Sequence, residues 1–339
     1  MQFRHYINKN PIKSVAVYSV AFLIFGVLST WFVLEKTTFI NKEIKSSRVL
    51  RLNQTDFPLI NPILLCSTDG NPVDEDKKLE SLVINFIDKR KSEGKLQDMS
   101  VYFVNYKMSN WVGVNENDKY DPASMLKVPT MIAYYKYAEN NPNILSETTS
   151  FEGDDQNTGK YFQSKNNIKE GKSYTIEELI NNMILNSDNT AGVLLGNYIA
   201  KNNLFNIYTD MRVPVPSTNS NVDYMSAKIY AYFFRILYNG SYLTRPYSEK
   251  SLDLLTKADF PAIRAGVPVE TTVAQKFGER SMYDDKGSLI NRELHDCGYV
   301  YKKDSPYLLC VMSRGRDFEV MRKNIEDLSR LVYEYMDKD

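Results

Sequence analysis

Residues 124–127 read Ser-Met-Leu-Lys, and the apolar run that follows them predicts a buried helix. A serine hydroxyl is a weak nucleophile at neutral pH, and a lysine three residues later on a helix lies on the same face, one turn away. Lys127 is therefore a candidate general base for Ser124. A second Ser-x-x-Lys, at residues 92–95, lies in a charged segment with no apolar run after it and no partner motifs. We interpret it as coincidence, because Ser and Lys are common residues.

The sequence around Ser124 predicts that it lies at the N-terminus of this helix. Residues 121–123 are a loop-like lead-in, and residues 125–135 are largely apolar. Pro129 is tolerated only near the first turn of a helix, which agrees with a start at about Ser124. Free amides and the helix dipole at that end would favour developing negative charge.

A second motif, Ser-Asp-Asn at 187–189, falls at a predicted turn between two helices. Thr175 and Glu178 form a predicted capping box that opens the first of these helices. From the turn, Ser187 could relay a proton while Asn189 binds a substrate carbonyl. A simple capping turn is the alternative, because Ser, Asp and Asn often make one. The preceding Ser-x-x-Lys favours catalysis.

A third motif, Lys276-Phe277-Gly278, lies in a short strand-like run from 273 to 279 that ends in a close-approach glycine. A lysine there would hold an anionic substrate carboxylate. Its charge would also help to keep Lys127 neutral, because two ammonium groups repel each other. The alternative is an edge strand with an ordinary lysine. The order of the three motifs along the chain disfavours that alternative.

Together the motifs resemble those of the penicillin-recognising serine enzymes, most closely the class A beta-lactamase family with its S-x-x-K, S-D-N and K-T-G set. Val128 and Pro129, residues 174–195, and a hairpin of 294–300 with 306–315 are also similar to that family. The resemblance covers residues from about 76 to 339. It implies an α+β, beta-lactamase/transpeptidase-like fold, in which an antiparallel sheet flanked by helices lies beside an all-helical subdomain.

The resemblance implies an acyl-serine mechanism between these two parts. Ser124 would be the nucleophile, Lys127 its general base, and Ser187 a proton relay. The substrate would be a beta-lactam or a peptidoglycan-like amide. Such chemistry requires no metal and no cofactor.

The resemblance also implies which residues bind the substrate. Asn189 would be a substrate ligand, and Lys276 with Gly278 would clamp the substrate at the sheet edge. The backbone amides of Ser124 and Glu279 would form the oxyanion hole.

The chain departs from the family where a glutamate is expected. Class A enzymes carry an E-x-x-L-N pattern between the second and third motifs, and its glutamate activates the deacylating water. From 191 to 224 the only acids are Asp210 and Asp223, and neither begins that pattern. We therefore expect slow release of the acyl group. Asp223 could take the place of this glutamate. Alternatively, it could cap a predicted helix over 224–238 or lie in its first turn.

A second departure is Phe277, which replaces the hydroxyl residue of K-T-G. The change removes a donor to the substrate carboxylate and predicts a differently shaped pocket. Arg280 could compensate by gripping a carboxylate with two hydrogen bonds, or it could be an ordinary surface arginine.

The N-terminal part of the chain predicts a membrane anchor. Residues 14–34 are 21 consecutive residues without a charge, enough to cross a bilayer once. No small-residue cleavage site follows, so we expect an uncleaved signal anchor. Lysines and arginines flank both ends of the span, so their count alone does not orient it. Substrates in the cell wall imply a single-pass protein whose catalytic domain is extracytoplasmic.

The predicted organisation is a tail (1–13), a transmembrane signal anchor (14–34), a stalk (35–75) and a beta-lactamase-like catalytic domain (76–339). Within that domain, apolar periodicity predicts a helix from about Leu79 and a C-terminal helix over 318–335.

The composition narrows the choice of partners and ligands. The chain carries 42 basic and 42 acidic residues, so nothing calls for nucleic acid. Its two histidines exclude a His-rich metal site, and we expect His295 and Cys297 to be strand residues rather than zinc ligands. The three cysteines give no disulfide framework, although a hairpin would bring Cys297 opposite Cys310.

Three functions compete at this point. The first is a membrane-anchored serine hydrolase of the class A beta-lactamase type, acylated at Ser124. The second, favoured by the missing glutamate, is a penicillin-binding DD-peptidase or an esterase. The third, favoured by Phe277, is a non-catalytic protein that binds cell-wall peptide or a protein partner. The presence of both a nucleophile and a base argues against the third, and the sequence leaves the oligomeric state open.

Overall fold

The computed structural model describes residues 29–30, 49–51, 56–66, 74–105, 110–164, 166–202, 206–215, 223–258 and 260–337. The predicted membrane span lies outside these ranges, except for Ser29 and Thr30, which are helical. In the part of the chain that is described, no helix combines the length and apolar character that a membrane crossing needs. Two short strands, β1 and β2, pair with each other in a separate sheet.

The helices and strands follow one another in an order typical of an α+β domain. In chain order they are β1 (Val49–Arg51), β2 (Ile63–Cys66), β3 (Asp74–Glu75), α2 (Lys77–Ser92), β4 (Asp98–Asn105), β5 (Asn110–Val114), η1 (Ala123–Leu126), α3 (Lys127–Ala138), η2 (Pro142–Ser146), β6 (Thr148–Ser150), β7 (Ser173–Thr175), α4 (Ile176–Leu185), α5 (Asn189–Asn202), α6 (Asn206–Asp210), α7 (Ala227–Tyr238), α8 (Arg245–Thr256), η3 (Arg264–Gly266), β8 (Val273–Tyr283), β9 (Leu289–Val300), β10 (Tyr307–Gly315) and α9 (Phe318–Tyr335).

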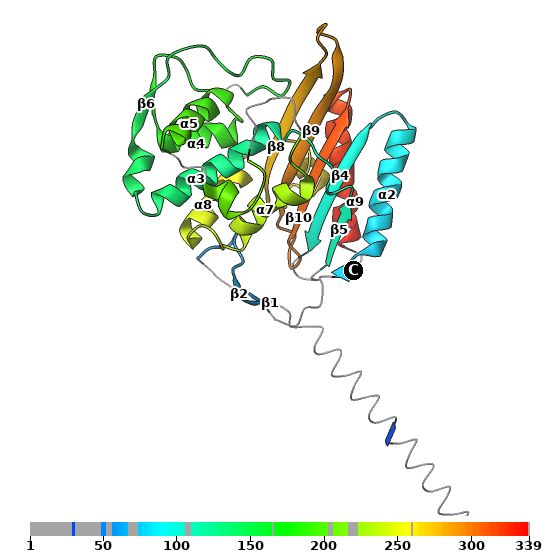
Figure 1. Ribbon diagram of the computed structural model, residues 1–339. Coiled ribbons are helices and arrows are strands. Elements are labelled where there is room, and N and C mark those ends of the chain that lie inside the picture. Colours follow the sequence, from blue (N-terminus) through cyan, green and yellow to red (C-terminus); the bar gives the residue numbers. More distant parts are fainter. Residues whose placement is uncertain are drawn as a thin grey trace, which may run out of the picture. The chain divides into compact units, whose positions relative to one another are not determined.

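The main sheet has the strand order β3-β5-β4-β10-β9-β8. Its five longer strands are antiparallel, and the two-residue β3 pairs parallel to β5 at one edge. Helices α2 and α9 cover one face, while the helical part that contains α3, α4, α5, α7 and α8 lies on the other side (Figure 1). The predicted α+β architecture, an antiparallel sheet flanked by helices beside an all-helical part, is therefore confirmed.

Helix α9 illustrates how the apolar pattern builds the fold. Its apolar residues recur every three or four positions, which places them on one face of a helix. The six apolar residues on this face are buried against the sheet: Phe318, Met321, Ile325, Leu328, Val332 and Tyr335. Burying such side chains stabilises the fold by roughly 1.5 to 3 kcal/mol each. The predicted helix and its observed bounds agree.

Two predicted helix starts need correction. Ser124 does not open the α-helix: it lies in the 3₁₀ turn η1, and α3 begins at Lys127. The helix predicted from Tyr224 begins at Ala227, because the Ser226 hydroxyl accepts a hydrogen bond from the Ile229 amide and caps it. In contrast, the capping box of Thr175 and Glu178 is formed as predicted.

Cys297 and Cys310 are directly opposite each other on β9 and β10, and they form a disulfide. The sequence predicts this hairpin but no disulfide framework, so the bridge corrects that expectation. The reason is the register of the two strands, which places both thiols side by side within the buried core.

Part of the predicted stalk packs against the helical part. The backbone amides of Leu59 and Ile60 donate to the Glu249 carboxylate on α8, at 3.0 and 3.1 Å. The hydroxyl of Tyr301 donates to the Leu59 carbonyl at 2.9 Å. Ile60 is buried in the same core as α3 and α7.

Candidate active site

The structure brings the first motif together as the sequence predicts. Ser124 is the second residue of η1 and Lys127 the first residue of α3, so one turn separates them. Lys127 Nζ lies 3.0 Å from Ser124 Oγ. The residue before the serine, Ala123, has a φ of 48°, in the left-handed region that a non-glycine residue rarely occupies.

The second motif forms a tight turn between α4 and α5. Ser187 has a φ of 50°, and its side chain is buried. Asp188, fully buried, accepts hydrogen bonds from the amides of Ile168 and Thr190 at 2.7 and 2.9 Å and from the Asn157 side chain at 2.9 Å. The middle residue of the motif therefore joins the turn to Asn157 and Ile168, a role that the motif alone does not reveal.

The Lys127 amine joins both motifs. Its Nζ lies 2.5 Å from the Ser187 carbonyl oxygen, 2.7 Å from Asn189 Oδ1 and 3.2 Å from Ser187 Oγ. The two carbonyl oxygens can only accept hydrogen bonds. A neutral amine would give them both of its N–H groups, so its lone pair would face the hydroxyls of Ser124 and Ser187.

The surroundings of Lys127 favour this neutral form. The side chain is buried, and burial lowers its pKa well below the ordinary value. The positive charges of Lys276 and Lys160 lower the pKa further, while Asp188 and Glu279 oppose the shift.

Lys276, from the third motif, reaches the same place from the edge strand β8. Its Nζ donates to Ser187 Oγ at 3.0 Å and to the Phe277 carbonyl at 2.9 Å. Burial lowers the pKa of Lys276 to about 7, with a contribution from Lys160. The group can therefore change charge near neutral pH.

Lys160 is a third lysine at this turn, and no sequence motif pointed to it. Its Nζ donates to the Ser187 carbonyl at 2.8 Å, and burial lowers its pKa. The residue lies in the 155–164 segment between β6 and β7, outside any recognisable motif. Only the folded arrangement of this segment could have identified it.

Phe277 does not point into open space. Its ring stacks on Phe260 at a centroid distance of 3.9 Å and meets the edge of Phe162 at 6.0 Å. Only 9% of the residue is exposed. The ring therefore belongs to an aromatic cluster between β8 and the 155–164 segment.

Glu279, at the predicted oxyanion position, uses its side chain to hold the same segment. Its carboxylate accepts the amides of Tyr161 and Phe162 at 3.2 and 3.1 Å. Burial raises the pKa of Glu279 above its ordinary value, while these amides lower it. The carboxylate thus ties the 155–164 segment to the sheet edge.

A cleft of about 450 Å³ lies beside the nucleophile. Residues of η1, α3, α4, α5 and β8, together with Gln156, line it: Ala123, Ser124, Leu126, Lys127, Thr130, Gln156, Met183, Asn189, Gly192, Val193 and Glu279. Among these lining residues, the one carboxylate is that of Glu279. The candidate nucleophile, base and amide ligand all border the same space, which suits a small acyl donor.

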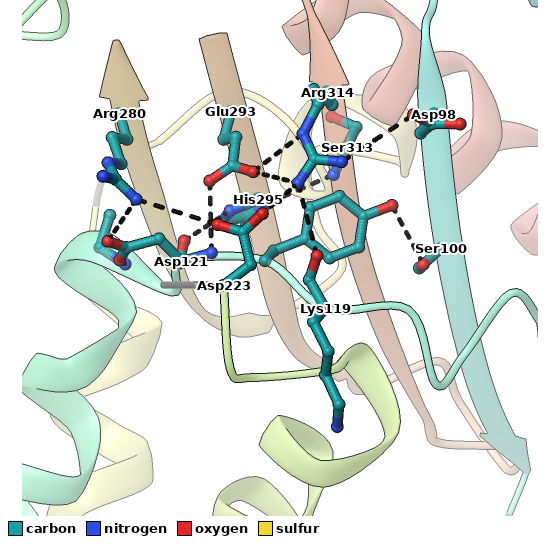
Figure 2. A network of polar contacts seen from close by, with 12 residues as sticks. Asp98, Ser100, Lys119, Asp121, Asp223, Arg280, Glu293, His295, Ser313 and Arg314 are labelled. Carbon is teal, nitrogen blue, oxygen red and sulfur yellow. Dashed lines mark hydrogen bonds and ion pairs between the residues drawn. The ribbon is translucent and has the colours of Figure 1, made fainter. Parts of the chain in front are cut away.

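Asp223 and Arg280 belong to a different group of charges. Arg280 Nη1 pairs with Asp121 Oδ2 at 2.7 Å, and Asp223 pairs with Arg314 at 2.8 Å (Figure 2). Asp223 does not cap α7, because Ser226 does. Both residues lie outside the lining of the cleft.

His295 and Cys297 lie on β9, as the sequence predicts. The Ser313 amide donates to His295 Nδ1 at 3.2 Å, so the proton is on Nε2, which donates to the Asp121 carbonyl at 2.9 Å. Burial lowers the pKa of His295 to about 3. The ring is therefore neutral at physiological pH.

Comparisons with known proteins support the sequence resemblance. The family model described as the beta-lactamase enzyme family matches residues 78–336. A comparison with curated protein sequences gave no match.

Several solved structures share the fold of this chain, which confirms the predicted beta-lactamase/transpeptidase-like fold. PBP-A, in a variant captured as an acyl-enzyme with penicillin G, is 20% identical, with a TM-score of 0.63 over 79% of this chain and 100% of that one. TLA-3 extended-spectrum beta-lactamase is 15% identical, with a TM-score of 0.65 over 76% and 99%. A beta-lactamase from Chitinophaga pinensis is 17% identical, with a TM-score of 0.65 over 77% and 100%.

Proposed function

Because the chain belongs to the beta-lactamase enzyme family, we propose that it is a serine hydrolase that forms an acyl-enzyme at Ser124. The observation that carries the proposal is the position of the Lys127 amine, 3.0 Å from Ser124 Oγ and shielded from water. A lysine serves as a general base only when it is neutral, and burial beside two other lysines favours that state.

The geometry supports a complete proton path for acylation. Lys127 Nζ takes the proton from Ser124 Oγ as that oxygen bonds to the carbonyl carbon of a beta-lactam or a peptidoglycan-like amide. When the carbon–nitrogen bond breaks, the leaving nitrogen needs a proton. Ser187 Oγ lies 3.2 Å from Lys127 Nζ and 3.0 Å from Lys276 Nζ, so it can pass that proton on. The amides of Ser124 and Glu279 would stabilise the developing oxyanion.

We propose that release of the acyl group is slow. A deacylating water needs a free base beside the ester, and the one carboxylate among the residues lining the cleft is already bound by two backbone amides. The same observation favours a second candidate function, that of a penicillin-binding DD-peptidase or an esterase. In either enzyme the natural acyl group would be released without a water activated by a free carboxylate.

We further propose that residues 14–34 anchor the enzyme in a membrane with its catalytic domain outside the cytoplasm. The proposal rests on the uncharged run of 21 residues. Resistance of the full-length chain to alkaline extraction from membranes would support the anchor, and release of the chain would contradict it.

A fluorescent penicillin tests the acylation directly. We expect the full-length chain in detergent to gain the mass of one penicillin and to lose it slowly, while Ser124→Ala gains none. Intact-mass spectrometry over time separates the two steps. Rapid loss with product formation would contradict slow deacylation. No adduct on the wild-type chain would contradict acylation by beta-lactams and favour an esterase or a binding protein.

The pH dependence of acylation is expected to report on Lys276. Acylation needs neutral Lys127, so its rate falls as the pH drops through the pKa of that group. Below pH about 7 Lys276 is charged, and its charge lowers the pKa of Lys127. Lys276→Gln removes the charge, so the fall in rate should move to higher pH, whereas Lys276→Arg should not move it upward. Equal midpoints for Gln, Arg and wild type would contradict the coupling.

A further inference from the structure

The turn that precedes the nucleophile, residues 121–123, is strained. Asp121 Oδ1 accepts a hydrogen bond from the Ala123 amide at 2.8 Å, which closes a tight turn just before Ser124. Ala123 has a φ of 48° within it. Such a conformation costs of order 1 to 3 kcal/mol for a non-glycine residue, and it persists only where the surroundings enforce it.

Three side chains from the sheet hold Asp121 at three different atoms. Arg280 Nη1 on β8 pairs with Oδ2 at 2.7 Å, and the Glu293 carboxylate on β9 accepts the backbone amide at 3.3 Å. His295 Nε2, also on β9, donates to the backbone carbonyl at 2.9 Å. Figure 2 shows the three groups converging on Asp121. Its carboxylate, amide and carbonyl are thus all bound by the sheet.

The sheet itself holds these groups in a row of alternating charge. Arg280 on β8 is directly opposite Glu293 on β9, which is opposite Arg314 on β10, which is opposite Asp98 on β4. The Glu293 side chain is fully buried and pairs with Arg314 at 2.6 Å. Asp223 pairs with Arg314 at 2.8 Å and lies 3.9 Å from Arg280. Cross-strand pairs of opposite charge stabilise a sheet, and the Asp223 carboxylate links Arg280 to the Arg314–Glu293 pair.

We propose that Arg280 is a positioning residue: through the ion pair with Asp121 it holds the 121–123 turn, and so Ser124 Oγ, in the geometry that acylation requires. The inference rests on the proposed acylation of Ser124. A serine that is held near its attacking position reacts faster, and a displacement of 1 Å can cost about 100-fold in rate. Arg280 lies outside the lining of the cleft, so we expect it to affect the rate of acylation and not the binding of the acyl donor.

A matched ion pair elsewhere in the fold provides the control. Arg90 on α2 pairs with Asp327 on α9 at 2.7 Å, and the two side chains are 19% and 21% exposed. Arg280 and Asp121 also pair at 2.7 Å, and they are 17% and 20% exposed. Both arginines have a second acid within 4.0 Å. The Arg90 pair joins two helices on the face of the sheet away from Ser124.

The experiment compares Arg280→Ala, Arg280→Lys and Arg90→Ala in the full-length chain. Acylation by a fluorescent penicillin, followed over a range of concentrations, gives the limiting rate constant and the dissociation constant separately. We expect Arg280→Ala to lower the rate constant about 10- to 100-fold with an unchanged dissociation constant. Arg280→Lys should restore most of the rate. Arg90→Ala should lower the melting temperature similarly but leave the rate constant unchanged.

Equal rate constants for Arg280→Ala and wild type would overturn the proposal, as would an equal loss of rate in Arg90→Ala. Should Arg280→Ala fail to fold, Asp121→Asn removes the ion pair while keeping the acceptor for the Ala123 amide. The same loss of rate is expected there.

Affinity for phenylboronic acid, which adds reversibly to an activated serine oxygen, separates this inference from the proposed function. Weaker binding by Arg280→Ala than by wild type would support the positioning role even if penicillin is not a substrate. A wild-type chain that binds neither probe would overturn both.

Discussion

Replacing Lys127 by methionine is expected to slow acylation at Ser124 by about 10²- to 10⁴-fold, the usual contribution of a positioned general base. Methionine has nearly the length of lysine and keeps its apolar stem, but it cannot take a proton. The amine lies within hydrogen-bonding distance of Ser124 Oγ, at 3.0 Å. The measurement is the limiting rate of penicillin adduct formation at pH 8.

The stability of the Lys127→Met variant distinguishes lost chemistry from lost folding. Removing a buried amine removes its desolvation cost, but it leaves Asn189 Oδ1 without that donor, while the Ser187 carbonyl keeps the hydrogen bond from Lys160. These effects oppose each other, so we expect the melting temperature to change by only a few degrees. A folded variant with a rate within tenfold of wild type would show that another group is the base.

Arginine at the same position tests whether charge alone is needed. Lys127→Arg keeps a cation beside Ser124, yet a guanidinium is never neutral in proteins. We expect it to be as slow as the methionine variant. A fast Lys127→Arg enzyme would contradict the general-base role and favour a purely electrostatic one.

The parts of the fold that the sequence predicted are those encoded by local patterns. The apolar stripe of α9 and the capping box at Thr175 depend on residues a few positions apart, whereas the hairpin of β9 and β10 was predicted from the family resemblance. The three motifs of the candidate site were recognisable because the residues within each are also a few positions apart. That the three motifs meet around the Ser187 turn depends on the whole fold, and we inferred the fold from the family resemblance.

Other features depend on contacts between segments distant in the chain. In the motif alone, Phe277 only indicates that the hydroxyl residue of K-T-G is lost. In the structure its ring stacks on Phe260 and contacts Phe162. Arg280 reads as a surface residue or a substrate ligand, but strand register places it opposite Glu293. No local spacing encodes these partners. The same limit explains why Lys160 was missed.

Replacing Gly278 by alanine is expected to reduce acylation at least about 100-fold and to destabilise the fold by about 1 to 3 kcal/mol. A Cβ at this position would lie 2.5 Å from the Pro122 carbonyl oxygen and 2.9 Å from Met125 Cγ. The Met125 chain can rotate, but the carbonyl belongs to the turn that precedes Ser124. The strand and the nucleophile turn must therefore separate, which moves Ser124 away from the edge of β8.

Gly196→Ala is the matched control, because a Cβ there meets nothing within 4 Å on helix α5. Alanine favours a helix over glycine by about 0.5 to 1 kcal/mol, so this variant should be at least as stable as wild type and equally fast. Urea denaturation and the limiting acylation rate are measured for both variants. If Gly278→Ala is acylated at the wild-type rate, then β8 can move away from the 121–123 turn without disturbing Ser124. The close contact between Gly278 and Pro122 would then contribute to packing alone. If instead its rate falls while Gly196→Ala is unaffected, the absence of a side chain at Gly278 is what lets the sheet edge and the nucleophile share one site.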